Sequence, residues 1–431
     1  MDHETQGMIL HIDCNSFYAS CEVSLRPDLT GKPVVVANCN EAGGGIILAL
    51  TKEAKALGLK RGNPVFQVKD ILMKEHVAVF PANLPKYVDM SKRLMQVVRD
   101  MDMVVNFKQY SIDEFFGELP LDDPADLRDA ALQIKRHTEQ CTGIPVSCGI
   151  SLTYTLAKIA TWYSKHYPGY HGVCVLPEDK IEIALKKIQI ADVWGIGRRT
   201  APRLEAKGIT TAWQFYEKKE FEVQKLLNVN GVRTWKELHG QPSVDIDSQP
   251  RQKSIVHSRT FTYMTSDPEK MKGYIANYSV AASRKLRDQH SVCKCVSVFI
   301  STNPHREDME QYGNFATTTL DIATADTMKI TKAAIQALDS IFIPTYQYKR
   351  AGVMLTDITS DDAIQLGLFS PPSEIEKSKR LMETLDRLTT KFGMDSVRLA
   401  SQAFDKAKTD IPNFQPMKNE TTNLDDIIEV H

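Results

Sequence analysis

The stretches Ile9-Leu10-His11-Ile12-Asp13 and Tyr110-Ser111-Ile112-Asp113-Glu114 decide the fold. Each has the pattern of a β-strand that ends in acidic side chains. Carboxylates at the end of one strand and in the turn of another can converge on a single point, where their oxygens suit Mg²⁺. Two such ions close together stabilise both the attacking and the leaving oxygen of a phosphoryl displacement. The sequence therefore predicts nucleotidyl transfer of the polymerase type.

Composition describes an ordinary soluble globular protein. The chain has 431 residues, 42% hydrophobic and 25% charged, so two to four domains are expected. Its formal net charge of −1 means that any phosphate-binding surface is a local patch offset by acidic regions. No apolar run approaches the roughly 18 residues of a membrane-spanning helix. The N-terminal residues lack the features of an export signal, so a cytoplasmic location is expected.

The eight cysteines lack the spacing of a pair of zinc knuckles. Cys293 and Cys295 alternate along an apparent strand, which favours plain packing over zinc binding. Reduced thiols in a cytosol are the simplest interpretation.

The first 180 residues alternate strand and helix patterns. Strands are expected at 8–13, 32–37, 45–50 and 146–150, with a hairpin around 112–119. Helices are expected at 16–25, 51–57 (ended by Gly58), 86–101, 126–142 and 155–164. This mixture predicts an α+β sheet domain with helices on one face.

The remainder divides into a helical segment, a linker and a second α/β unit. Only helical patterns occur from 181 to about 239, and the stretch 241–252 has the polarity and prolines of a linker. Strands near 255–264, 292–301, 314–322 and 350–358 then alternate with helices near 268–288 and 326–340. A further helix extends to Phe392, and a polar, acidic tail follows.

The adjacent acids Asp113 and Glu114 have two interpretations. Like charges repel unless a cation neutralises them, although a hairpin turn with solvated acids is the commoner cause of such a pair. Asp13, at the end of an apolar strand with Phe17-Tyr18-Ala19 behind it, turns the balance toward a metal site.

Here the chain resembles a known family. Ile-Asp-Cys-Asn-Ser-Phe-Tyr-Ala-Ser-Cys-Glu (12–22), with Tyr-Ser-Ile-Asp-Glu (110–114), is similar to the catalytic signature of the Y-family translesion DNA polymerases. Ala-Ser-Cys-Glu and the segment Glu53-Ala54-Lys55-Ala56-Leu57-Gly58 are most similar to the UmuC-like branch. The resemblance covers residues 8 to about 400. It implies an error-prone DNA polymerase of low processivity with a right-hand architecture.

That architecture divides the chain as follows. The resemblance implies a palm with a ferredoxin-like sheet (1–30 and 85–180), small fingers (31–84), a helical thumb with a helix-hairpin-helix (181–240), a linker (241–252), an α/β little finger (253–360), a clamp-binding segment (361–372) and a C-terminal helical segment with an acidic tail (373–431).

The resemblance also implies catalytic roles. Asp13 and Asp113 would bridge two Mg²⁺ ions, Glu114 would complete the site that activates the primer 3′-hydroxyl, and the backbone carbonyl of Cys14 would be a further ligand. The protein's main contribution would be positioning.

Nucleotide contacts follow in the same way. Tyr18, beside Phe17, matches the aromatic steric gate that leaves no room for a 2′-hydroxyl; a core aromatic is the alternative. Lys55 and Lys165 match phosphate-contacting positions. Lys52 stands where many members have Tyr, so its contact is uncertain. Gly43-Gly44-Gly45 lacks the Lys-Ser/Thr of a Walker loop and is better explained as a flexible fingers segment.

Two regions are expected to hold DNA without reading its sequence. Gly195 and Gly197, followed by Arg198 and Arg199, resemble a helix-hairpin-helix that binds phosphate through backbone amides; Trp194 stands where the family commonly has Pro. In the second α/β unit the cations are Arg251, Lys253, Arg259, Arg284, Lys285 and Arg287, of which Lys253 and Arg259 are the expected DNA contacts. A solvated charged face is the alternative.

Gln365-Leu366-Gly367-Leu368-Phe369 resembles the bacterial sliding-clamp-binding motif, with Gln365, Leu366, Leu368 and Phe369 as the contacts. Primer–template DNA, a dNTP, the clamp and a UmuD-like accessory subunit are the expected partners; no membrane is expected. Two rivals remain. A nucleotidyl cyclase would share the carboxylate chemistry but would not need the hairpin, the little finger or the clamp peptide. A catalytically idle DNA- and clamp-binding protein would have no need of the acids.

Overall fold

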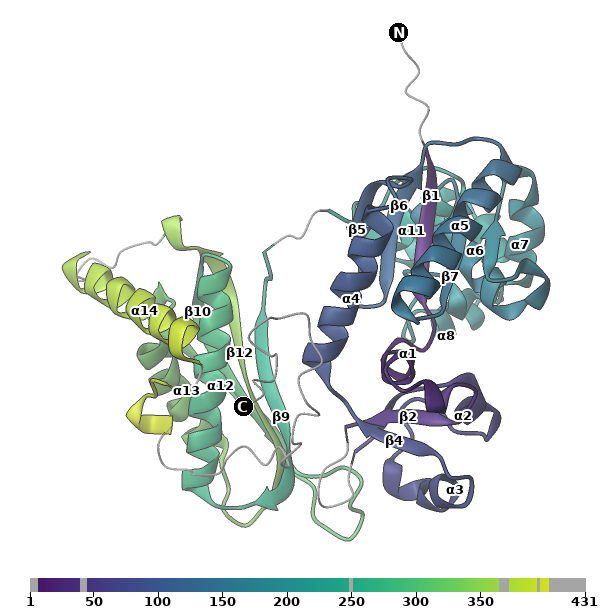
Figure 1. Cartoon of the computed structure of the whole chain (residues 1–431). Helices are drawn as coiled ribbons and strands as arrows, with labels where there is room; N and C mark the ends of the chain where they lie inside the picture. Colours follow the sequence, from purple (N-terminus) through teal and green to yellow (C-terminus); the bar gives the residue numbers. More distant parts are fainter. Residues whose placement is uncertain (1–6, 39–44, 248–250, 364–371, 394–395, 403–431) are drawn as a thin grey trace. The chain divides into compact units, whose positions relative to one another are not determined.

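The computed structural model describes residues 7–38, 45–247, 251–363, 372–393 and 396–402 and divides into two compact units, one within 1–248 and one within 249–412. Both combine helices with sheets, as the α+β prediction requires (Figure 1). None of the described helices is long and apolar enough to cross a membrane.

A five-stranded sheet forms the centre of the first unit. Its strands in spatial order are β5 (Val105–Gln109), β6 (Glu114–Leu119), β1 (Met8–Cys14), β7 (Val146–Ser151) and β8 (Val173–Val175). β1 lies between β6 and β7 and is antiparallel to both, whereas β7 and β8 are parallel. The acidic turn therefore lies at the end of β1.

Helices cover both faces of this sheet, so the prediction of helices on one face is wrong. Alternation along β1 sends Leu10 and Ile12 into a core with α4 (Leu84–Arg99) and α5 (Pro124–Thr142). It sends His11 to the other face, where α6 (Tyr154–His166) lies. There His11 Nδ1 and the Thr161 hydroxyl form a hydrogen bond of 2.8 Å. An apolar pattern alone did not reveal the second covered face, because His11 and Asp13 are polar.

Caps explain where several of these helices begin. Asp123 accepts from Ala125 and Asp126 at the start of α5, which has Pro at its first turn. Thr153 caps α6, and Thr51 caps α2 (Lys52–Ala56). Gly58, with φ of 84°, follows α2 as predicted.

The rest of the first unit comprises a small sheet and a helical segment. The small sheet has the strand order β3 (Ile47–Leu50), β2 (Val34–Ala37), β4 (Ala78–Pro81). The same part of the chain contains the helices α1 (Phe17–Ser24), α2 and α3 (Lys69–Lys74). The helical segment contains α7 (Ile181–Lys187), α8 (Ala201–Glu205), α9 (Ala212–Tyr216), α10 (Glu220–Leu226) and α11 (Val229–Leu238), with a core that is shared with α6. Short 3₁₀ turns occupy Pro27–Leu29, Val65–Gln67, Pro168–Tyr170, Glu178–Lys180 and Ile190–Asp192.

The second unit is a four-stranded antiparallel sheet with two long helices against it. The strand order is β11 (Gly313–Thr324), β10 (Ser291–Ser301), β12 (Tyr348–Ser360), β9 (Ile255–Thr265), and the helices are α12 (Pro268–Asp288) and α13 (Thr327–Ile341). A further helix, α14 (Pro372–Phe392), packs on this unit, and 3₁₀ turns occupy Asp361–Ala363 and Ala400–Gln402. All of the strands and helices predicted here from sequence are present.

Candidate active site

Three acidic residues come from neighbouring backbone positions at one end of the five-stranded sheet. Asp13 is the direct cross-strand partner of Glu114. The amide of Cys14 donates to the carbonyl of Asp113 at 2.9 Å. Tyr110 to Asp113 form the turn between β5 and β6, and Glu114 is the first residue of β6. The expectation that the second acidic pair ends a strand is therefore wrong: Asp113 directly precedes β6 and Glu114 begins it.

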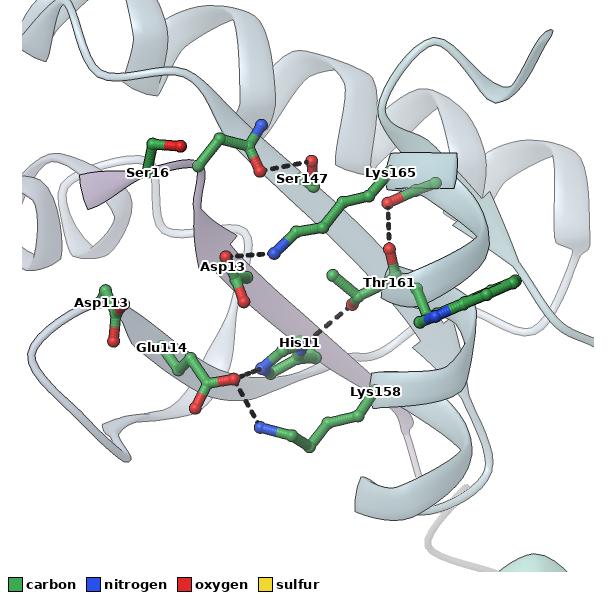
Figure 2. Close-up of polar contacts among 12 residues, drawn as sticks. His11, Asp13, Ser16, Asp113, Glu114, Ser147, Lys158, Thr161 and Lys165 are labelled. Carbon is green, nitrogen blue, oxygen red and sulfur yellow. Dashed lines mark hydrogen bonds and ion pairs between the residues drawn. The ribbon is translucent and has the colours of Figure 1, made fainter. Parts of the chain in front are cut away.

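Two lysines from α6 bind two of these acids (Figure 2). Lys165 Nζ lies 2.5 Å from Asp13 Oδ1, and Lys158 Nζ lies 2.6 Å from Glu114 Oε1. Lysines seven residues apart on a helix share one face, so α6 presents both to the sheet. Asp113 instead accepts a hydrogen bond of 2.6 Å from the Ser111 hydroxyl. Lys158 was not predicted as a site residue, although its spacing of seven residues from Lys165 was the available signal.

The acids share one electrostatic environment. Burial raises the pKa of Asp13, the charge of Lys165 opposes this, and the charges of Glu114 and Asp113 raise it further. Burial also acts to raise the pKa of Glu114, but the neighbouring His11 and Lys158 outweigh it and lower that pKa to about 2. Glu114 is therefore an anion at neutral pH.

His11 is a second residue that the sequence analysis did not single out. It lies two residues before Asp13 on the same face of β1. Its Nε2 is buried and lies 3.6 Å from Glu114 Oε1, while Nδ1 lies 2.8 Å from the Thr161 hydroxyl. Burial lowers the pKa of His11 to about 4, so the imidazole beside Glu114 is neutral at pH 7.

The donor set fits Mg²⁺ by its chemistry, because that ion prefers oxygen ligands such as carboxylates. The three carboxylates here come from adjacent backbone positions. The side chains themselves are not gathered into a cage. Within the described ranges, no group of three or more His, Cys, Asp or Glu side chains is arranged to hold a metal ion. Asp13 and Glu114 would have to leave their lysine partners to share an ion with Asp113.

Three aromatic rings surround the Lys158 ammonium, and one of them belongs to Trp194. The ammonium lies 5.0 Å from the ring centre of Tyr110, 5.4 Å from that of Trp194 and 5.6 Å from that of Phe116. The indole of Trp194 also donates to the Tyr110 hydroxyl at 3.3 Å. These cation–π contacts hold Lys158 toward Glu114. Trp194 therefore joins the helical segment to the acidic end of the sheet, beside a cavity of about 250 Å³.

The aromatic pair after Asp13 divides between core and site. Phe17 is 3% exposed and packs in the core. Tyr18 is half-buried, and its ring stacks on that of Tyr87 with centroids 4.4 Å apart. Burial, with the charge of nearby Asp113, raises the pKa of Tyr18. Tyr18 thus lies beside the acidic turn.

The other predicted phosphate contacts differ in their surroundings. Lys55 donates to the hydroxyl of Ser16, the residue that precedes α1, at 3.2 Å. Lys52 is 91% exposed and lies 3.9 Å from Glu53. Of the two, Lys55 is thus the one with a partner at the start of α1.

The glycine turn before α8 has an exposed, cationic surface. Arg198, Arg199, Gly195 and Gly197 are exposed. Gly195 has φ of 89°, and a Cβ there would lie 2.3 Å from the Thr234 hydroxyl, so only glycine fits.

The cations of the second unit do not form one free surface. Lys253 and Arg259 are exposed. Arg287, however, binds Asp386 of α14 through two hydrogen bonds of 2.6 and 2.7 Å, and Arg284 binds Thr389 and Thr390. The charge cluster expected from sequence is therefore divided, because α14 covers part of α12.

Two further expectations concern cysteines and the clamp motif. The seven described cysteines are free thiols, and Cys293 is fully buried, as the packing interpretation expects. The predicted clamp contacts Gln365, Leu366, Leu368 and Phe369 lie outside the described residues.

Comparison with known families gives a consistent result. A sequence model of the impB/mucB/samB family matches residues 12–162, and the model of that family's C-terminal domain matches residues 252–368. Protein UmuC of Salmonella typhimurium is 38% identical over 394 residues, covering 90% of this chain and 92% of that protein. The chain belongs to this family, the UmuC-like branch of the Y-family DNA polymerases.

Other relatives of this UmuC-like polymerase extend the comparison. Protein MucB of Escherichia coli is 34% identical, covering 93% of this chain and 94% of its own. DNA polymerase IV 1 of Bacillus subtilis is 26% identical, covering 91% and 92%. Among solved structures, the Y-family DNA polymerase chimera Dbh-Dpo4(243-245)-Dbh matches with a TM-score of 0.64 at 22% identity, over 82% of this chain and 99% of that one. That likeness supports the fold.

Proposed function

We propose that this Y-family polymerase adds deoxynucleotides to a primer 3′-hydroxyl with two Mg²⁺ ions held by Asp13, Asp113, Glu114 and the Cys14 carbonyl. The observation that carries the proposal is the cross-strand pairing of Asp13 with Glu114 beside the Asp113 turn. Bound Mg²⁺ would lower the pKa of the attacking hydroxyl and neutralise charge on the phosphate being transferred. The side chains would supply the ligands, and the sheet would fix their spacing.

The lysines of α6 would exchange partners when substrate binds. Lys165 and Lys158 neutralise Asp13 and Glu114 in the structure. A nucleoside triphosphate would bring negatively charged oxygens to the acidic end of the sheet. Lys165 would then release Asp13 and bind a phosphate oxygen, while the Asp13 carboxylate would bind a metal ion instead. Lys55, beside Ser16, would be a second phosphate contact.

The domain assignment is part of the proposal. The five-stranded sheet would be the palm, the three-stranded sheet the fingers, the helical segment the thumb and the four-stranded sheet the little finger. Gly195, Gly197, Arg198, Arg199, Lys253 and Arg259 would hold the backbone of primer–template DNA, and a UmuD-like subunit is a candidate partner.

Primer extension on undamaged and abasic templates tests this function. We expect templated addition of dNTPs on both. Binding of DNA without extension would instead favour the idle accessory protein, and cyclic nucleotide formation without a template would favour the cyclase. Extension of the undamaged template alone would remove lesion bypass from the proposal.

Replacing Tyr18 by Ala is expected to increase ribonucleotide incorporation, because the half-buried ring beside Asp113 would no longer occupy the space of a 2′-hydroxyl. The measurement is the ratio of kcat/KM for a dNTP to that for the matching rNTP. Tyr18→Phe is the control, since it keeps the ring and should keep the ratio. An unaltered ratio in Tyr18→Ala would rule out the steric-gate role.

Changing Leu368 and Phe369 to Ala is expected to abolish binding to the bacterial sliding clamp, because apolar side chains of this motif would fill a groove on the clamp. Surface plasmon resonance with immobilised clamp measures the loss. Primer extension without clamp should stay unchanged, which controls for folding. Equal clamp binding by the parent chain and the variant would remove the motif from the proposal.

A further inference from the structure

A buried ion pair lies between α1 and the first turn of α4. The Glu22 carboxylate accepts from Lys86 Nζ and from the Tyr87 hydroxyl, each at 2.7 Å. All three residues are 2% exposed or less. Charged groups are almost never this buried unless paired, and a buried pair contributes little net stability compared with apolar residues of the same size. Stability alone therefore does not explain the group.

The network fixes the orientation of one ring. Tyr87 is held at its hydroxyl by Glu22 and on its face by Tyr18, whose ring lies 4.4 Å away at an interplanar angle of 15°. Tyr18 and Glu22 are four residues apart on α1, so they lie on one face of that helix. α1 thus contacts Tyr87 at two points, through Glu22 at the hydroxyl and through Tyr18 on the ring face. Tyr87 in turn packs against one face of the Tyr18 ring.

We infer that Tyr87, anchored by Glu22 and Lys86, is a positioning residue that holds the Tyr18 ring in place and so contributes to sugar selectivity. The inference rests on the proposed role of Tyr18. A ring excludes a 2′-hydroxyl only if it cannot move away, and a half-buried tyrosine without support has several rotamers available. The stack with Tyr87 would restrict the Tyr18 side chain to rotamers in which its ring cannot move away from the nucleotide. The interaction energy of an offset aromatic pair corresponds to a change of about two- to tenfold in the ratio of dNTP to rNTP incorporation.

The experiment compares three substitutions in the full chain. Tyr87→Leu removes the stack, Tyr87→Met removes it while filling the space with a flexible side chain, and Tyr87→Phe keeps the ring but loses the hydrogen bond to Glu22. All three lose that hydrogen bond, so Tyr87→Phe is the matched control that isolates the stack. The readout is the ratio of kcat/KM for a dNTP to that for the matching rNTP, with thermal unfolding and DNA binding measured in parallel.

We expect Tyr87→Leu and Tyr87→Met to lower the ratio about two- to tenfold relative to Tyr87→Phe, mainly through faster ribonucleotide addition. In a Tyr18→Ala background the same changes should have no further effect, because the supported ring is gone. Tyr87→Met carries the test if Tyr87→Leu does not fold.

Two outcomes would overturn the inference. One is an unchanged ratio in Tyr87→Leu or Tyr87→Met while Tyr18→Ala lowers it. The other is an additional loss in the double variant, which would make Tyr87 act independently of Tyr18. An unchanged ratio in Tyr18→Ala itself would instead overturn the proposed gate, so the two failures are distinguishable.

Discussion

Asp113→Asn and Glu114→Gln are each expected to lower primer extension by about 10²–10³-fold or more, while primer–template affinity stays within about twofold. Asparagine can still accept the 2.6 Å hydrogen bond from Ser111, and glutamine can still meet Lys158, so neither change should disturb the turn. Each removes a negative charge that a metal site needs. Rapid-quench kinetics and fluorescence anisotropy measure the two quantities.

The matched control is Glu118→Gln. Glu118 is on the same strand as Glu114, four residues on, where it pairs with Ile9 and Val105 at the other end of the sheet. The same chemical change there should leave extension unaltered. Equal losses in Glu118→Gln and Glu114→Gln would indicate damage to β6, and undiminished extension by Asp113→Asn or Glu114→Gln would contradict the assignment of these acids.

Local patterns predicted what depends on nearby residues. The strand Met8–Cys14, helix α6 and the four strands of the second unit follow from alternation and helical spacing. The strands Ala78–Pro81 and Val173–Val175 were not predicted, because three or four residues carry little periodicity. The equally short Val34–Ala37 was predicted from its run of three valines, not from alternation. Their place comes from pairing with β2 and β7.

Partners distant in sequence could not be predicted. Lys158 binds Glu114 from 44 residues away, and Arg287 binds Asp386 from 99 residues away. The seven-residue spacing from Lys165 places Lys158 on a shared helix face, but no residue near Lys158 or Arg287 identifies the acid that it binds. Each contact exists only after a helix packs on a sheet or on another helix. The resemblance to a family supplied roles for Asp13 and Tyr18, but it did not indicate His11 or the aromatic rings around Lys158.

Gly149 is expected to be one of the most sensitive positions in the first unit. It pairs with His11 across β1 and β7 and faces α6. A Cβ there would lie 2.2 Å from the Thr161 amide nitrogen and 2.3 Å from the Ala157 carbonyl oxygen. Both are backbone atoms of a helix, so they cannot swing aside as a flexible side chain would. The absence of a side chain at Gly149 is what lets α6 approach the sheet.

Gly149→Ala should therefore destabilise the first unit by about 3 kcal/mol, the upper end of the usual cost of overpacking. For a unit of this size that corresponds to a fall in Tm of about 6–12 °C. Displacement of α6 would also carry Lys158 and Lys165 away from their acids, so extension should fall even below the melting temperature. Differential scanning calorimetry and primer extension at 20 °C measure the two effects.

Gly169→Ala is the control for this change. Gly169 is in the same unit, and a Cβ there meets nothing within 4 Å at an ordinary φ, so its Tm should not move. A Gly149→Ala variant with parental Tm would mean that α6 can shift without cost. A variant that loses stability but keeps full extension would mean that the lysines of α6 do not depend on this close packing. Loss of both stability and extension would show that the close packing of α6 on the sheet is needed at the acidic end of β1, where the reacting groups are proposed to meet.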